Sequence, residues 1–280
     1  MTKKQAMIEF QGGGASKNKL LRGNTKGFTF ALKNILPAFL QKKLAFTLAE
    51  VLITLGIIGI VAAMTLPTLI GNYQKKVLVN QLKKSVSTFE QGMQKIYVSE
   101  GAVSWDELGW GLGTPSILSH DSDFMFQKFK ENFNIVSYKI GTEREDLEYI
   151  KKMDSQDSVT DISWGGFFIL GFTIKLADGS IWYYQGSTDS YKNSFKVILD
   201  VNGEKGPNQA GRDVFMLVYT PKGRIAGAFS STYLKDISED LPDGFDNPFE
   251  AAFPCQKNAE LNNSGLCFQK IQDDGWEMNY

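Results

Sequence analysis

Glu50 most needs a chemical explanation, because it is the single charged residue between Lys43 and Lys75. The residues around it are predominantly apolar, and an apolar run of about 20 residues is long enough to cross a bilayer as a helix. A carboxylate inside such a run costs roughly 2.5 to 3.5 kcal/mol on insertion scales. It requires a partner or a proton, which marks Glu50 as a functional position.

Residues 42–70 read as a basic pair, Leu-Ala, Phe-Thr-Leu-x-Glu and then an apolar run. This order resembles the N-terminal signature of type IV pilins and type II secretion pseudopilins. The resemblance implies that a prepilin peptidase cleaves between Ala45 and Phe46 and methylates the new amine of Phe46, with alanine in place of the usual glycine. Counted from Phe46, Glu50 is the fifth residue and Pro67 the twenty-second, as in that family.

The resemblance also gives Glu50 a role in assembly. The amine of a cleaved Phe46 would pair with Glu50 of a neighbouring subunit and help to set the axial stagger between subunits. Pro67 removes one helical hydrogen bond, so we expect the helix to bend or open there. Two other interpretations stay open: an ordinary single-pass anchor with a stray acid, and a conventional secretory signal cleaved near Ala63.

Charge is divided unevenly along the chain. Residues 1–45 hold nine Lys or Arg and one acid, whereas residues 46–280 hold 21 basic and 30 acidic residues. Basic segments stay on the cytoplasmic side of a membrane. We therefore expect a single-pass protein of the bacterial inner membrane with a cytoplasmic N-terminus and an exported head, which then joins a periplasmic or cell-surface filament. The acidic exported part argues against nucleic acid as a partner.

Four segments are expected. A basic leader, residues 1–45, is removed on processing, and residues 46–70 form a transmembrane and filament-core helix. Residues 71–98 continue this helix as an amphipathic segment, and residues 99–280 form the exported globular head. The amphipathic segment is predicted from apolar residues at three- and four-residue steps, which are Val77, Leu78, Leu82, Val86, Phe89, Met93, Ile96 and Tyr97.

The expected fold class is α+β, with the long N-terminal helix packed on an antiparallel sheet, as the pilin resemblance implies. Two short helices are predicted, at residues 121–132 and 142–153, the second opening with a capping box. Turn signals at residues 177–180 and 221–223 separate β-rich runs. The predicted strands are residues 167–176, 181–184, 195–200, 214–220 and 225–229, which gives a sheet of four or five strands.

A segment rich in glycine and in side-chain oxygen, residues 200–213, lies between two predicted strands. Carboxylate and amide oxygens with turning backbone are typical ligands of calcium, and some pseudopilins hold calcium in a loop of the head. The candidate calcium ligands are Asp200, Asn202, Glu204, Asn208 and Asp213. The alternative is a connector whose Asp and Asn side chains cap their own turns. No cofactor is required by the sequence, and calcium is the only one it suggests.

The two cysteines, Cys255 and Cys267, are expected to form a disulfide, because an exported head lies in an oxidising compartment. Many type IV pilins staple a C-terminal loop in this way. A reduced pair of core thiols and a metal-binding pair are the alternatives.

Catalysis has little support in the sequence, so we do not expect an enzyme. The chain has one histidine, His120, and no phosphate-binding glycine motif follows a predicted strand. The expected function is a prepilin-like structural subunit of a type IV pilus or type II secretion pseudopilus. Its expected partners are the prepilin peptidase, like subunits, an inner-membrane assembly platform and membrane lipid. The alternatives are a membrane-anchored surface binding protein or adhesin (a minor pilin) and a membrane-tethered enzyme.

Overall fold

The computed structural model describes residues 46–103, 105–108, 121–141, 144–159, 171–185, 194–237, 247 and 254–280. Contacts within the chain divide it into two compact units, Met1–Ile57 and Ile58–Tyr280. Several predicted features lie outside the described residues: the leader with Ala45, His120, the first two residues of the helix expected from residue 142, and residues 167–170 of the first predicted strand.

The longest element is helix α1, Leu48–Glu100, which confirms the single long helix expected over residues 46–98. α1 remains helical through Pro67, so the helix does not open there. Its residues from Leu78 to Tyr97 include the buried face that the periodicity predicts. The apolar part of α1 that precedes this face is exposed: none of the most apolar 18-residue stretch of the helix is buried.

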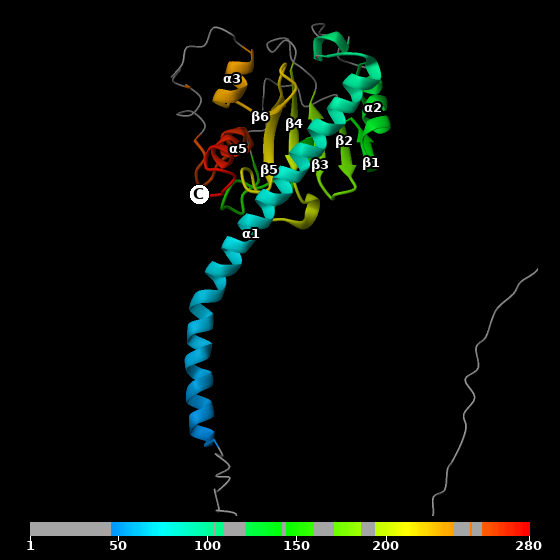
Figure 1. Ribbon diagram of the computed structural model, residues 1–280. Helices are drawn as coiled ribbons and strands as arrows, with labels where there is room; N and C mark the ends of the chain where they lie inside the picture. Colours follow the sequence, from blue (N-terminus) through cyan, green and yellow to red (C-terminus); the bar gives the residue numbers. More distant parts are fainter. Residues whose placement is uncertain are drawn as a thin grey trace, which may run out of the picture. The chain divides into compact units, whose positions relative to one another are not determined.

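Six strands form one antiparallel sheet in sequential order, so each strand pairs with the next along the chain. The strands are β1 (Ile135–Ile140), β2 (Phe172–Leu176), β3 (Ile181–Gln185), β4 (Phe195–Asp200), β5 (Val214–Tyr219) and β6 (Ile225–Gly227). The head part of α1 runs across one face of this sheet (Figure 1). The α+β class is therefore confirmed, and the described residues contribute six strands where four or five were expected.

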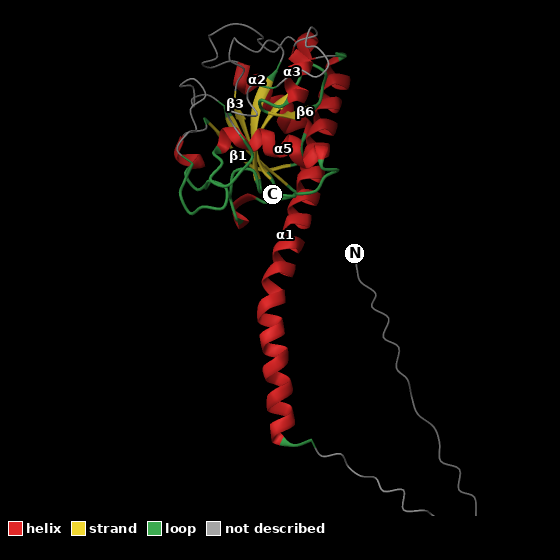
Figure 2. Cartoon of the chain, turned by 90° about the vertical axis from the view of Figure 1, so that its left-hand side faces the viewer, coloured by secondary structure: helices red, strands yellow, loops and turns green. Residues whose placement is uncertain are grey.

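Among the described residues, three further helices pack around the sheet: α2 (Asp121–Asn132), α3 (Ser231–Ile237) and α5 (Ser264–Asp273). Short 3-10 helices lie at Trp105–Leu108, Arg144–Leu147, Gly203–Lys205 and Leu261–Asn263. Figure 2 shows α1 along one side of the strands. The prediction of α2 is confirmed, whereas α3 and α5 were not predicted.

Both faces of the sheet are packed, and side chains alternate between them with the two-residue period of a strand. Residues of β5 that face α1 and α2 are Phe215, Leu217 and Tyr219, and those in the second core are Val214, Met216 and Val218. The second core also includes Leu147 and Ile150, together with Tyr233 of α3. Because β4 and β5 are buried along their whole length, these two central strands hold the loop between them in a fixed place.

The prediction of a helix at residues 142–153 is wrong. Among the described residues of this span, only Arg144–Leu147 forms a short 3-10 helix, and the chain then leaves helical geometry. Lys151 donates its backbone N–H to the Asn208 carbonyl at 2.7 Å, and its own carbonyl accepts from Ala210 N–H at 2.9 Å. Hydrogen bonds to a distant loop therefore replace the local bonds that a helix would need.

Aromatic packing joins α1 to the sheet. The Phe89 ring of α1 stacks on Trp182 of β3, with 4.4 Å between ring centroids. One turn further along α1, Gly92 lies against the Phe133 ring, and a Cβ atom at this position would be 2.2 Å from Phe133 Cζ. The glycine therefore allows the ring to pack directly on the helix backbone.

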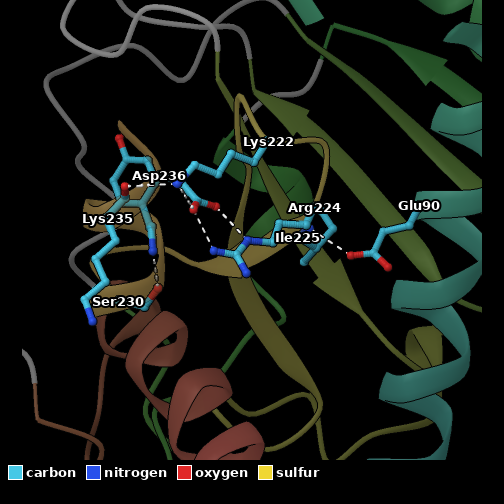
Figure 3. Close-up of polar contacts among 8 residues, drawn as sticks. Glu90, Lys222, Arg224, Ile225, Ser230, Lys235 and Asp236 are labelled. Atoms are coloured by element: carbon cyan, nitrogen blue, oxygen red, sulfur yellow. Dashed lines mark hydrogen bonds and ion pairs between the residues drawn. The ribbon is translucent and has the colours of Figure 1, made fainter. Parts of the chain in front are cut away.

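Polar contacts reinforce this attachment at β6 (Figure 3). Glu90 of α1 accepts a hydrogen bond from Ile225 N–H at 3.0 Å. The neighbouring Arg224 donates through Nε and Nη2 to the two carboxylate oxygens of Asp236, at 2.8 and 2.6 Å, and Lys222 Nζ lies 3.3 Å from Asp236 Oδ1. Burial opposes ionisation of Asp236, but the hydrogen bonds from Arg224, Thr220 and Lys222, together with the charge of Arg224, lower the pKa of Asp236. These contacts link α1, β6 and α3.

Candidate functional site

Glu50 lies in the first turn of α1 and makes a reciprocal cap with Thr47. Glu50 Oε2 accepts hydrogen bonds from the Thr47 backbone N–H at 2.7 Å and from Thr47 Oγ1 at 2.8 Å. In return, Thr47 Oγ1 accepts from Glu50 N–H at 3.2 Å. This is a capping box, in which a threonine and a glutamate three residues later satisfy backbone donors that have no partner in the first helical turn.

The cap fixes where the helix begins, and it uses one side of the carboxylate. Oε1 of Glu50 has no hydrogen-bond partner among the described residues. For Glu50 the sequence predicts pairing between subunits, whereas the cap was not predicted, although Thr-x-x-Glu is its standard signature. One carboxylate can serve both purposes, because its two oxygens together provide about four acceptor positions.

Apolar side chains surround this cap and continue along the helix. Phe46 is 81 % exposed and Leu48 is 77 % exposed. Large apolar side chains that stay exposed further along are Val51, Leu52, Ile53, Leu55, Ile57, Ile58, Ile60, Val61, Met64, Leu66, Leu69 and Ile70. Monomeric soluble proteins rarely expose a continuous apolar surface of this extent. By length and composition α1 can cross a membrane, and this surface suits lipid or another apolar helix.

The structure brings together Asp200 and Asp213, and the Asn202 side chain hydrogen-bonds Asp213. Asp200 ends β4 and is paired in register with Val214 of β5, so hairpin closure places the two acids close together. Asp213 accepts from the backbone N–H groups of Asn208 and Gln209 at 2.8 and 2.7 Å. Asp200 Oδ2 accepts from Tyr149 Oη at 2.9 Å, and Oδ1 accepts from Asn202 N–H at 3.2 Å.

Both carboxylates are fully buried, and this changes their protonation. Burial, followed by the nearby charge of Asp213, raises the pKa of Asp200 to about 7. Burial also raises the pKa of Asp213, against the hydrogen bonds from Gln209 and Asn208. Two close carboxylates in a buried site favour holding a proton between them.

The other three candidate ligands are either exposed or hydrogen-bonded to the backbone of their own loop. Glu204 is exposed, the Asn202 amide donates to the Gly206 carbonyl at 2.8 Å, and Asn208 Oδ1 accepts from Gly206 N–H at 3.0 Å. Among the described residues, no group of three or more His, Cys, Asp and Glu side chains gathers as a metal site. The Asp and Asn side chains hold the turns of their own loop, and calcium binding stays a prediction.

Cys255 and Cys267 form a disulfide, with 4.9 Å between their Cα atoms. Cys267 belongs to α5 and is fully buried, while Cys255 precedes the short helix at Leu261–Asn263 and is partly buried. The bond ties this loop to a helix that packs on β5 and β6. The pairing agrees with the expectation from the sequence.

The fold and the site define an α+β protein with one exposed, membrane-compatible helix whose first turn carries a capped carboxylate. Comparison with known proteins found no matching family model, no similar curated protein and no similar solved structure. The function of this chain must therefore be inferred from its own residues.

Proposed function

We propose that this chain is a prepilin-like subunit that is cleaved before Phe46 and polymerises through the N-terminal part of α1 into a type IV pilus or type II secretion pseudopilus. The apolar helix surface provides cohesion between subunits. The Phe46 amine of one subunit pairs with Glu50 of its neighbour and sets the register. The head, whose two described hydrophobic cores contain none of residues 46–70, faces outward.

The observation that carries the proposal is the position of Glu50 on a helix that is otherwise apolar and exposed. In a simple anchor the carboxylate would serve only the cap with Thr47, and it would add a cost of insertion. An ion pair with a new amine offsets that cost when subunits assemble. The unused Oε1 of Glu50 is in place to accept such a contact.

Two substitutions separate assembly from helix capping. Glu50→Gln keeps a side-chain acceptor for Thr47 but removes the charge, so we expect the chain to insert in the membrane and fail to form filaments. Leaving one partner of a buried ion pair unmatched costs about 3 to 5 kcal/mol. Thr47→Val removes the hydroxyl of the cap and keeps the charge, and we expect it to retain filaments at a cost of about 1 kcal/mol in helix stability.

The measurement is the fraction of the chain in sheared filaments relative to the membrane fraction of the producing cells. Mass spectrometry of the filament protein should give a methylated N-terminus at Phe46. Equal filament yields from Glu50→Gln and the unmodified chain would contradict the proposed ion pair. A chain that keeps its leader and stays monomeric in the membrane would contradict the proposed function as a whole.

A further inference from the structure

A cavity of about 580 Å³ opens beside α1 at the base of the head. Its walls are α1 between Gly71 and Gln81, the β4–β5 loop and Met278. The charged residues that line it are Lys75, Lys205 and Arg212, and no acid is among its described lining residues. This is a local reversal of charge, because residues 46–280 hold 30 acidic and 21 basic residues.

The cavity follows directly on the apolar part of α1. Lys75 is five residues beyond Ile70, which is roughly 7.5 Å along a helix axis. The headgroup layer extends roughly 5 to 8 Å beyond the hydrocarbon core of a bilayer. Tyr73 also lines the cavity and is 68 % exposed, and tyrosine is enriched at the boundary between membrane and water.

We propose that this cavity binds the phosphate of an anionic phospholipid headgroup, with Lys205 and Lys75 as its cationic contacts. The site rests on the membrane insertion that the proposed function requires. The Lys205 ammonium is exposed and has no partner among the described residues. Lys75 Nζ donates to the main-chain oxygen of Tyr280 at 2.5 Å, which leaves two of its three N–H groups for a ligand.

Three other residues of the cavity wall, Arg212, Pro207 and Met278, could contact the remaining part of a lipid headgroup. The Arg212 guanidinium is fixed at the wall by Asp154, with 2.8 Å between Nη2 and Oδ1. The exposed Pro207 adds apolar surface beside the largely buried Met278, which fits the glycerol part of a phospholipid better than a free phosphate ion. A lipid bound here would anchor the base of the head to the membrane surface.

The test uses the full chain in vesicles of phosphatidylcholine that contain a minor fraction of phosphatidylglycerol. After gentle detergent release, native mass spectrometry measures how much phosphatidylglycerol stays bound. We expect one retained molecule per chain, about tenfold weaker binding for Lys205→Glu, and recovery for Lys205→Arg. Lys235→Glu is the matched control, because Lys235 is an exposed lysine of α3, and α3 lies at the opposite end of the head from the β4–β5 loop (Figure 1).

The possible outcomes distinguish the lipid site, the type of ligand and membrane insertion. Equal retention by Lys205→Glu and the unmodified chain overturns the site while membrane insertion, measured separately by resistance to alkaline extraction, stands. Displacement of the lipid by an equal concentration of inorganic phosphate overturns the choice of a lipid and favours a soluble phosphate ligand. A chain that does not insert overturns the proposed function and this site together.

Discussion

At the residue scale, Gly92 has a packing role that its low helix propensity does not reveal. The Phe133 ring lies on it and is held by Phe89 and Phe129, with centroid distances of 5.4 and 4.9 Å. An added methyl group would overlap this ring, and overpacking of a core costs about 1 to 3 kcal/mol. We therefore expect Gly92→Ala to lower the free energy of unfolding, although alanine favours a helix by about 1 kcal/mol. Urea denaturation measures the difference.

Gly71→Ala is the control for this prediction. Gly71 belongs to the same helix, and nothing lies within 4 Å of the position its Cβ would take. The free energy of unfolding should stay the same or rise slightly for this variant. Equal effects of the two substitutions would show that helix propensity, and not contact with Phe133, determines the result.

The buried Asp200 carboxyl gives the head a pH dependence. Its pKa in the folded protein is about 7, whereas an unfolded aspartate titrates near 3.9. The folded state therefore keeps a proton that the unfolded state releases, and stability should fall as the pH rises from about 4 to about 7. Glu90, whose pKa burial also raises, acts in the same direction. Asp200→Asn should remove a large part of the slope in melting temperature across this range.

Lys196 sets the upper limit of the pH range for the Asp200 experiment, and Glu204 provides its control. The pKa of Lys196 is lowered by burial to about 7, so its contribution to stability changes only above that pH. Glu204→Gln, in the same loop but exposed, should leave the slope unchanged. Repeating the melts with calcium tests the calcium prediction, because bound calcium would keep both aspartates ionised and raise the melting temperature near pH 7.

At the element scale, the disulfide connects a loop to α5. Cross-linking residues at a sequence separation of 12 stabilises a fold by about 3 kcal/mol, largely by restricting the unfolded chain. Cys255→Ala should lower the free energy of unfolding by about 2 to 4 kcal/mol. Cys255 is the better target because Cys267 is fully buried, so changing it would also disturb the core.

Reduction provides an independent check on the same bond. A thiol reductant should destabilise the unmodified chain by a similar amount and leave Cys255→Ala unaffected. If reductant changed both proteins equally, its effect would not come from this disulfide.

Elements were predictable where their signals are local. The period of α1 and the Asp178-Gly179 turn between β2 and β3 depend on neighbouring residues, and both were predicted correctly. β1 was missed because Val136, Tyr138 and Ile140 are exposed, so its apolar residues do not mark a buried face. The helix expected at residues 142–153 failed because that backbone bonds to a loop about 60 residues away.

The candidate site was likewise predictable only where its signal lies in neighbouring residues. The Thr47–Glu50 cap can be found in four consecutive residues. The buried pair Asp200 and Asp213 could not, because its proximity depends on the register of β4 against β5. The base cavity also needs α1, a strand connection and Met278 to come together, and no local sequence pattern specifies that arrangement.

At the scale of the whole molecule, the uneven charge predicts topology. Lys42 and Lys43 lie directly before the apolar run, and residues 1–45 hold nine basic residues and one acid. Basic residues close to a membrane span determine which side stays in the cytoplasm. We expect Lys42→Glu with Lys43→Glu to lower the fraction of chains whose head is exported. Protease added to intact spheroplasts measures that fraction, since only an exported head is digested.

Lys3→Glu with Lys4→Glu makes the same change in net charge about 40 residues further from the span, beyond the roughly 15 to 20 residues over which flanking charge acts. This control should leave export unchanged. If both pairs reduced export equally, total leader charge rather than charge beside the helix would govern topology. If neither pair reduced export, the apolar helix alone would determine it.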